Sequence, residues 1–393
     1  MTHYPYLIIG GGMTGAAAAN AIREVDEASV IGLVSAEPEP PYDRPPLSKK
    51  LWEGKKGVDE IYLSLPGNVQ PHFGRRVVAL DPAVRAVTLD DGAGHTYGRL
   101  LLATGGDPRR LPFGGDAINY YRTLADYRAL RADAARGARF VVIGGGFIGS
   151  EVAASLRKQG NDVTLVFPEA GISDRLFPAS MAAYLIDMFR AHGVEVLAES
   201  KVIDIGVGAG GATVTLGDGR RLAADRVVAG IGLLPEVALA RAAGLAVDNG
   251  ILVDAHLQTN ATGVYAAGDV ANYPDAILGM RRRVEHADAA RAMGRAAGRN
   301  MAGAAEPYRY LPMFYSDLFE LSYEAVGQCD SRLEIVADWQ ETFKKGVLYY
   351  LQDGRVRGVM LVDVWEKVDE ARTLIEAGDE VDPASLPGRI HNE

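Results

Sequence analysis

Two short glycine-rich segments could bind phosphate groups. Each has the pattern G-x-G-x-x-G, with Gly10, Gly12 and Gly15 in the first and Gly144, Gly146 and Gly149 in the second. In this pattern the first glycine permits a tight turn, the second lets a pyrophosphate approach the backbone, and the third lets a helix pack close to a strand. The helix N-terminus adds partial positive charge. One such segment is weak support for a nucleotide site, but two predict two bound dinucleotides.

The elements expected around these segments repeat in the same order. Apolar strands are predicted at 6–9 and 140–143, followed by alanine-rich helices at 16–24 and 152–158. The next apolar strand ends in an acid each time, at Glu37 and Glu169, where a carboxylate can accept hydrogen bonds from ribose hydroxyls. We therefore predict two related domains, and FAD with a nicotinamide cofactor is the simplest pair of ligands.

Composition narrows the class of protein further. The chain has 393 residues, long enough for two or three domains, and a net charge of −10 weighs against nucleic acid as the main ligand. Its one cysteine, Cys329, excludes an internal disulfide framework and a cysteine-rich metal site, so no metal is expected. No apolar run is long enough to span a bilayer, and no leader precedes the first strand. A cytoplasmic protein is the expectation.

The segment Thr259–Asp269 resembles the second flavin motif, T-x-x-x-x-V-Y-A-x-G-D, of the FAD-dependent pyridine nucleotide reductases. The resemblance implies that Gly268 and Asp269 bind FAD, with Asp269 at the ribityl chain. It also implies that the N-terminal copy binds FAD and the second copy binds NAD(P)H. The glycine turns at the family's domain crossings correspond to Thr104 with Gly105, and to Gly232.

Glu169 also bears on the choice of nicotinamide cofactor. A carboxylate near the 2′ position of the ribose would repel a 2′-phosphate, and the first arginine after it is Arg175. We therefore predict a preference for NADH over NADPH. A surface glutamate after a strand is the alternative.

Residues 42–52 narrow the resemblance to the group of apoptosis-inducing factor and the oxygenase-type ferredoxin reductases, which has the motif R-P-P-L-S-K-x-L-W there. No cysteine lies in this region, so thiol chemistry is not expected, and Cys329 is predicted to be a packed, inert thiol. The sequence departs from the group at Tyr315, where tryptophan is usual, and in the short stretch from Asp330 to Lys345, where the animal factor has a long insertion.

The resemblance implies that Lys49 lies beside flavin N5 and pairs with Glu151 near the nicotinamide. A lysine cation would stabilise negative charge on the flavin, and a carboxylate would offset the cost of burying it. The alternatives are a solvated lysine and a glutamate that satisfies the helix dipole. Phe147, next to Ile148 in the second glycine turn, could gate the nicotinamide or simply pack against the sheet.

Further candidates come from the same resemblance. Glu285 and His286 match a pair near the flavin, where a histidine could shuttle a proton, or they are a polar cluster that begins a helix. Arg44 is predicted to help hold FAD, and Tyr315 either packs near the flavin or belongs to the core. The run Arg281–Arg283 is either a solvated face or a basic docking patch.

The predicted fold class is α/β, with two Rossmann-like domains in a glutathione-reductase-like arrangement and a smaller C-terminal α+β domain. The expected bounds are 1–113 and 246–308 for the FAD domain, 114–245 for the NAD(H) domain and 309–393 for the last. Within the last, a hairpin is predicted around Asp353-Gly354 and a helix at 368–377.

The predicted function is that of an FAD-dependent NADH oxidoreductase. NADH would reduce the flavin, which would pass electrons to an iron–sulfur protein, a quinone or oxygen. One alternative is an NADH-dependent ferredoxin or rubredoxin reductase of an oxygenase system. Another is an NADH-sensing protein with a long-lived reduced flavin–NAD complex that changes its oligomeric state, such as to a homodimer.

Overall fold

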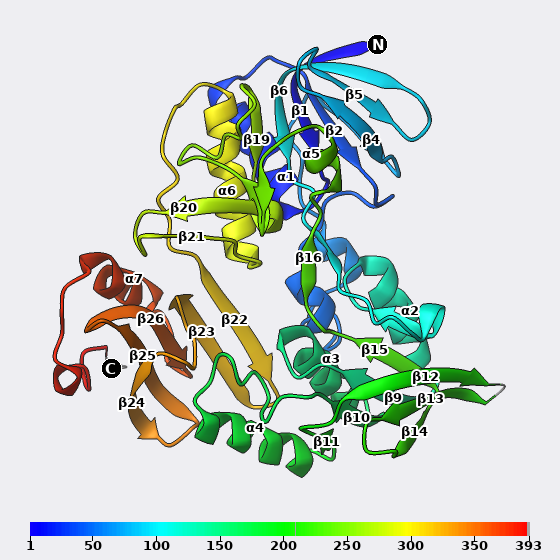
Figure 1. The fold of residues 1–393 in the computed structure, drawn as a ribbon, viewed down its shortest axis with the longest axis vertical. Helices are drawn as coiled ribbons and strands as arrows, with labels where there is room; N and C mark the ends of the chain where they lie inside the picture. The colour runs from blue at the N-terminus through cyan, green and yellow to red at the C-terminus, as the bar shows by residue number, and fades with distance from the viewer. Residues whose placement is uncertain (209, 391–393) are drawn as a thin grey trace. The chain divides into compact units, whose positions relative to one another are not determined.

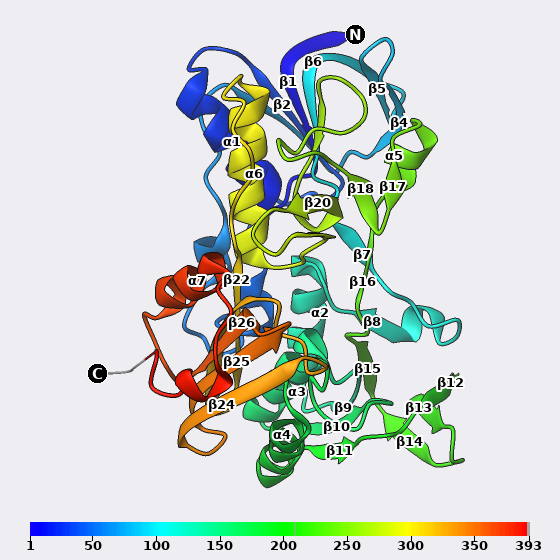
Figure 2. The same cartoon turned by 60° about the vertical axis from the view of Figure 1, so that its left-hand side comes forward.

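The computed structural model describes residues 1–208 and 210–390, and the chain separates into two compact units (Figures 1 and 2). The first unit contains 1–43, 58–107 and 234–312. The second contains 44–57, 108–233 and the chain from Met313 onward. The division into three domains stays a prediction.

The first unit is built on a seven-stranded sheet. Its strands are β1 (Thr2–Ile9), β2 (Ile31–Ser35), β3 (Val69–Phe73), β4 (Val77–Asp81), β5 (Ala86–Leu89), β6 (Gly94–Leu102) and β19 (Val264–Ala266). The order is β3-β2-β1-β6-β5-β4, and β19 also pairs with β6. Strands β3, β2, β1, β6 and β19 run parallel, and β2 is buried along its whole length, as expected when both faces of a parallel sheet are covered.

Two helices of this unit, α1 (Met13–Val25) and α6 (Ala287–Met301), lie side by side (Figures 1 and 2). A short helix, α5 (Ala238–Ala242), and two 3₁₀ turns, η2 (Val58–Ile61) and η4 (Gly268–Val270), complete the helical part. A four-stranded sheet has the order β17 (Val247–Asp248), β18 (Gly250–Leu252), β20 (Ala271–Asp275) and β21 (Met280–Arg282).

The second unit repeats the plan with a five-stranded parallel sheet. Its order is β11 (Glu195–Leu197), β10 (Asp162–Val166), β9 (Arg139–Ile143), β15 (Arg226–Ala229) and β8 (Ile118–Tyr120). The helices are α2 (Leu124–Ala134), α3 (Phe147–Lys158) and α4 (Ala179–Ala191). A small antiparallel sheet is formed by β12 (Val202–Gly208), β13 (Gly211–Leu216) and β14 (Arg221–Ala224).

An antiparallel sheet forms the C-terminal part of this unit. Its order is β22 (Met313–Leu318), β23 (Leu321–Gly327), β26 (Arg355–Val362), β25 (Lys345–Gln352) and β24 (Glu334–Glu341). The predicted hairpin is confirmed, because β25 pairs with β26 across Asp353 and Gly354, which both have positive φ. The predicted helix is confirmed as α7 (Val368–Ala377), which packs on β23 and β26.

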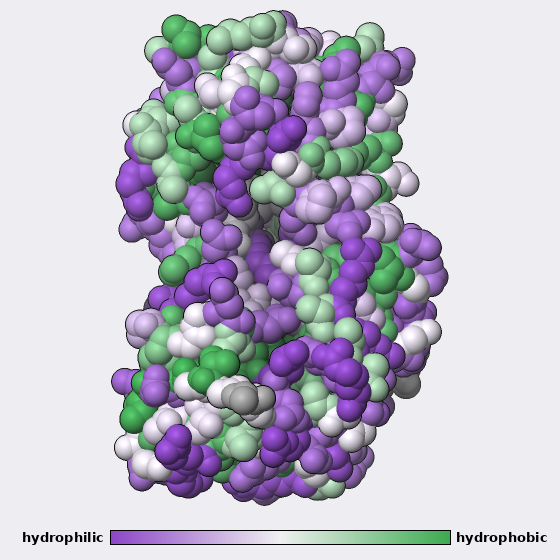
Figure 3. All heavy atoms as spheres, turned by 90° about the vertical axis from the view of Figure 1, so that its right-hand side faces the viewer, coloured by the Kyte–Doolittle hydropathy of each residue, from purple (hydrophilic) through white to green (hydrophobic). Residues whose placement is uncertain are grey.

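The remaining elements are short. Strands β7 (Gly106–Pro108) and β16 (Leu233–Pro235) pair where the chain passes from one unit to the other. The second unit also has the 3₁₀ turns η1 (Pro45–Ser48), η3 (Gly115–Ala117) and η5 (Pro383–Ser385). On the face shown in Figure 3, hydrophobic residues are scattered among hydrophilic ones. The predicted α/β class with a smaller C-terminal α+β part is confirmed.

Candidate active site

The first glycine turn joins β1 to α1 and is closely packed at two of its three glycines. A side chain on Gly10, which has φ +122°, would lie within 3.0 Å of the Ala103 carbonyl. A side chain on Gly15 would meet the Gly10 carbonyl at similarly short range. Gly12, in contrast, has open space where its Cβ would be. This is the pattern expected of a turn that leaves room for a ligand at its second glycine.

The second glycine turn, between β9 and α3, has the same geometry. Gly144 has φ +110° and lies against the Gly230 carbonyl, while Gly149 lies against the carbonyl of Gly144. The space beside Gly146 is open.

Both helices also begin in a way that favours an anion. Gly12 and Gly146 are the N-caps of α1 and α3, and glycine has no side chain to satisfy the first amides. Neither first turn contains an acid, so the partial positive charge of each helix end is not neutralised there. Both cradles therefore fit the pyrophosphate of a dinucleotide.

The two predicted ribose acids follow the second parallel strand of each unit. Glu37 comes after β2 and accepts a hydrogen bond of 2.5 Å from the Tyr42 hydroxyl. Glu169 comes after β10, is half-buried, and accepts a backbone hydrogen bond of 2.9 Å from Glu199 at its carbonyl. Their roles at ribose stay predictions.

The predicted second flavin motif lies beside the first glycine turn. Gly268 has φ +77°, and a side chain there would collide with the Thr14 side chain in the first turn of α1. Asp269 is in η4, and its carbonyl accepts a hydrogen bond of 3.0 Å from Nη1 of Arg283. The same Nη1 lies 2.6 Å from the Glu285 carboxylate. Arg283 thus links the Asp269 carbonyl to the Glu285 carboxylate, close to the start of α1.

Arginines 281–283 make hydrogen bonds and ion pairs within the first unit, and Arg281 is exposed. Nη1 of Arg281 donates to the carbonyls of Val253 and Asn272, at 2.9 and 2.6 Å. Arg282 pairs with Asp275 at 2.7 Å and is 13% exposed.

The two predicted crossing turns are also hydrogen-bonded. Thr104 donates its hydroxyl to the Glu236 carbonyl at 2.9 Å, and the Gly105 carbonyl accepts from the Glu236 amide at 3.0 Å. The Gly232 carbonyl, in the second unit, accepts from the Arg109 amide at 2.9 Å. Gly105 and Gly232 both have positive φ, which explains the residue type.

His286 is the N-cap of α6. Its removal from water lowers the pKa of the imidazole to about 4, and the positive charge of Arg282 acts in the same direction. The ring is therefore neutral at neutral pH and is a weaker proton acceptor than a histidine with its ordinary pKa of about 6.5. Its proton-transfer role stays a prediction.

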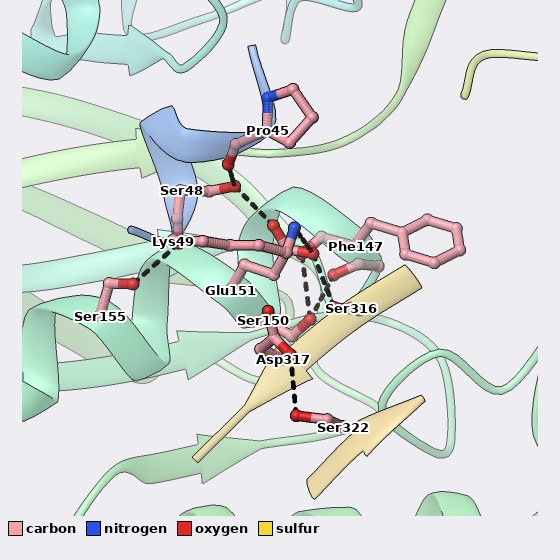
Figure 4. A network of polar contacts seen from close by, with 11 residues as sticks. Pro45, Ser48, Lys49, Phe147, Ser150, Glu151, Ser155, Ser316, Asp317 and Ser322 are labelled. Carbon is pink, nitrogen blue, oxygen red and sulfur yellow. Dashed lines mark hydrogen bonds and ion pairs between the residues drawn. The ribbon is translucent and has the colours of Figure 1, made fainter. Parts of the chain in front are cut away.

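The predicted ion pair is present in the second unit (Figure 4). Nζ of Lys49 lies 2.6 Å from Oε1 of Glu151, and the side chains are 9% and 3% exposed. Lys49 follows η1, and Glu151 is in α3, soon after the second glycine turn. Nζ also lies 5.2 Å from the centre of the Tyr315 ring. The alternative of a solvated lysine is thereby wrong.

Three serines complete this network, and none of them was predicted as a site residue from the sequence. Ser316 donates to Oε1 of Glu151 at 2.6 Å, and Ser48 donates to Oε2 at 2.5 Å. Ser155, one helical turn after Glu151, donates to the Ser48 carbonyl at 2.9 Å. For Ser316, the sequence did contain a signal. It alternates with Phe314 and Leu318 at the inward positions of β22, where a serine places a hydroxyl among apolar side chains.

The other predicted residues of this unit lie near the ion pair or anchor its segment. Phe147 and Ile148 are 37% and 38% exposed, and Phe147 packs edge-on against Phe314 with the ring centres 5.6 Å apart. Tyr315 is 38% exposed, so it is not a core aromatic. Arg44 donates to the Arg122 carbonyl at 2.9 Å.

Three further predictions concern Cys329, membrane spans and metal sites. The Cys329 thiol is half-buried and lies 3.6 Å from the Val326 carbonyl and 3.7 Å from that of Val359. Within residues 1–208 and 210–390, every helix is too short or too polar to cross a bilayer. Over the same ranges, no group of three or more His, Cys, Asp or Glu side chains is arranged to hold a metal ion.

Comparison with known proteins identifies the family. Residues 4–294 match the family described as pyridine nucleotide-disulphide oxidoreductase, and residues 297–342 and 337–377 match the C-terminal domain of mitochondrion-associated apoptosis-inducing factor. Mitochondrial apoptosis-inducing factor 1 of Dictyostelium discoideum is 36% identical over 416 residues, which cover 95% of this chain and 78% of that protein.

Two reductases are also similar over nearly their whole length. The ferredoxin–NAD(+) reductase component of the anthranilate 1,2-dioxygenase system of Burkholderia cepacia is 36% identical over 397 residues, which cover 98% of this chain and 97% of that protein. The fold matches the crystal structure of the covalent putidaredoxin reductase–putidaredoxin complex with a TM-score of 0.91 and 32% identity, over 98% of this chain and 96% of that one.

These matches confirm the resemblance, the predicted cofactors FAD and NADH, and the predicted FAD-dependent NADH oxidoreductase activity. The chain belongs to the pyridine nucleotide-disulphide oxidoreductase family.

Proposed function

We propose that this protein oxidises NADH and passes the electrons through FAD to a small iron–sulfur protein. The buried Lys49–Glu151 pair carries the proposal. It supplies a positive charge shielded from water, in a segment of the sequence that has no cysteine for thiol chemistry. Similarity over nearly the whole chain to a ferredoxin–NAD(+) reductase and to putidaredoxin reductase supports the choice of acceptor. The use of NADH and the sparse use of cysteine support a cytoplasmic location.

FAD, when bound, supplies the redox chemistry, since a flavin can accept a hydride from a nicotinamide and release electrons one at a time. The residues of the chain supply binding and electrostatics. Gly12, at the start of α1, would bind the FAD pyrophosphate, and Gly146, at the start of α3, would bind that of NADH.

Lys49 would place a positive charge where negative charge develops during reduction. A cation in a shielded site acts more strongly than one in water, which is why its 9% exposure matters. Glu151 would hold the Lys49 ammonium in place and offset the cost of its burial.

The proposal is tested by an anaerobic two-step experiment. The holoprotein is reduced with NADH and is then mixed in separate runs with a [2Fe–2S] ferredoxin, a soluble quinone or oxygen. The return of oxidised-flavin absorbance is timed in each run. We expect the ferredoxin to react at least about tenfold faster than the other acceptors at equal concentration, and to do so more slowly as salt is raised. Faster reaction with quinone or oxygen would refute the choice of acceptor.

A redox-sensing role is the second candidate. The match of residues 297–342 and 337–377 to the apoptosis-inducing factor C-terminal domain favours it. In that case every acceptor would reoxidise the protein slowly. NADH would also change its oligomeric state, for example from monomer to homodimer. Light scattering of the protein with and without NADH distinguishes the two roles.

A further inference from the structure

Both carboxylate oxygens of Glu151 are occupied by donors from different parts of the chain. Oε1 lies 2.6 Å from Nζ of Lys49 and accepts a 2.6 Å hydrogen bond from Ser316, while Oε2 accepts a 2.5 Å hydrogen bond from Ser48 (Figure 4). Ser48 is 4% exposed and Ser316 is 1% exposed, so water does not compete well for these contacts.

Helix α3 holds the Ser48–Lys49 segment with two side chains from one face. Glu151 binds the Ser48 hydroxyl and the Lys49 ammonium, and Ser155, four residues later, binds the Ser48 carbonyl at 2.9 Å. The orientation of Glu151 therefore determines where the Lys49 charge is held.

Ser316 reaches the same carboxylate from β22, which is 165 residues away in the sequence. A buried hydroxyl needs a hydrogen-bond partner, because burying it unpaired is costly, and Glu151 is that partner for Ser316. On the adjacent strand, Tyr323 pairs with Ser316 in the sheet register. Burial raises the pKa of the Tyr323 phenol well above its ordinary value, and the negative charge of Glu151 adds to this. Tyr323 thus stays neutral beside the Glu151 carboxylate.

We propose that Ser48 and Ser316 are positioning residues for flavin reduction, because together they fix the Glu151 carboxylate as an oriented anion and so hold Lys49 in place. The inference rests on the roles proposed above for Lys49 and Glu151. Hydroxyl donors favour the ionised form of a carboxylate and restrict its rotation. The C-terminal sheet contributes to the redox site through Ser316, although its sequence is remote from both glycine turns.

The test compares Ser48→Ala and Ser316→Ala with a matched control, Ser322→Ala. Ser322 lies on β23 and donates a 2.7 Å hydrogen bond to Asp317, so it is also a serine bound to a carboxylate in the C-terminal sheet. Anaerobic stopped-flow measurement with NADH gives the flavin reduction rate, the NADH dissociation constant and the pH profile of the rate.

We expect each of the first two variants to slow reduction about tenfold, with the dissociation constant changed less than about twofold. The acidic limb of the pH–rate profile should move to higher pH, because the anion has lost a donor. Ser316→Thr, which keeps the hydroxyl, should restore the rate and the profile. Ser322→Ala should match the natural protein in all three measurements.

A Glu151→Ala background separates positioning from a general structural effect. If Ser316 acts through Glu151, then Ser316→Ala should have little further effect in that background. An equal loss in both backgrounds, or unchanged rates in both serine variants, would overturn the proposal. If Ser316→Ala does not fold, Ser48→Ala in the same two backgrounds gives the same test. Only reduction by NADH is measured, so a wrong assignment of the electron acceptor would leave this result unaffected.

Discussion

Glu151 and Lys49 depend on each other because both are buried. Replacing Glu151 by alanine leaves the Lys49 ammonium without its partner, and replacing Lys49 removes the charge proposed to act at the flavin. We expect either change to slow flavin reduction on the order of tenfold to a hundredfold, while NADH affinity changes less than about threefold. Stopped-flow reduction over a range of NADH concentrations separates the two quantities.

Lys158→Ala is the matched control for this pair. Lys158 is also in contact with a glutamate, Glu53, at 3.4 Å, but it is 34% exposed, so its ion pair contributes little. A reduction rate equally impaired in Lys158→Ala and Lys49→Ala would contradict the special role of the buried pair.

Glu169 is predicted to reject NADPH by charge repulsion. Replacing it by alanine should raise kcat/KM for NADPH relative to NADH by about tenfold, because one unfavourable interaction with the 2′-phosphate is lost. Steady-state kinetics with both cofactors measure the ratio. Asp162→Ala is the control, since Asp162 is at the opposite end of the same strand, β10. An unchanged ratio in Glu169→Ala would place the discrimination elsewhere.

His286 should make the fold sensitive to acid. Its pKa is lowered to about 4 in the folded protein, whereas an unfolded histidine has a pKa near 6.5. As the pH falls from about 6.5 to about 4, the unfolded chain binds a proton first, so the free energy of unfolding decreases by up to about 3 kcal/mol. Above pH 6.5 the residue has no such effect. Denaturant unfolding of His286→Gln should show a weaker dependence of the unfolding free energy on pH over this range than the natural protein shows.

At the scale of single elements, the glycine turns predict two different kinds of defect. Gly146 has open space and an extended backbone, so alanine fits there but occupies the expected phosphate position. We expect Gly146→Ala to weaken NADH binding about tenfold or more, with the melting temperature unchanged.

Gly149→Ala should instead destabilise the fold. Alanine favours the helix by about 1 kcal/mol, but its Cβ would collide with the Gly144 carbonyl, and backbone cannot move cheaply. The collision should dominate, with a net loss of at least about 1 kcal/mol in the free energy of unfolding. Thermal melts and NADH titrations of both variants give four values, and a stable Gly149→Ala would show that the helix can shift.

Local patterns in the sequence were sufficient to predict some of these elements. The hairpin around Asp353 and the helix 368–377 depend on contacts between near neighbours, so their sequence signals are strong. The Ser316–Glu151 contact joins residues far apart in the chain, and nothing in the alternation of β22 identifies its partner. The Lys49–Glu151 pair was predicted only through the resemblance to a family.

At the scale of the whole molecule, the segment 44–57 is an integral part of the second unit. Trp52 donates to the Tyr121 hydroxyl at 3.1 Å, and the Tyr127 hydroxyl donates to the Leu51 carbonyl at 3.2 Å. A fragment of residues 114–245 alone would expose Tyr127 and leave Ser155 without its partner. We expect this fragment to melt at a lower temperature than the whole protein, or to aggregate. A stable fragment in circular dichroism, with NADH affinity intact, would show that the segment is dispensable.

The interleaved order of the two units also constrains how the protein is made. Every part of the first unit has been synthesised once Pro312 has been added, whereas the second still lacks β22 and the strands that follow. The Glu151 carboxylate lacks its Ser316 donor until β22 has been synthesised as well. A premature stop after residue 312 would therefore yield a nascent chain that can complete its first nucleotide cradle but never its buried charge network.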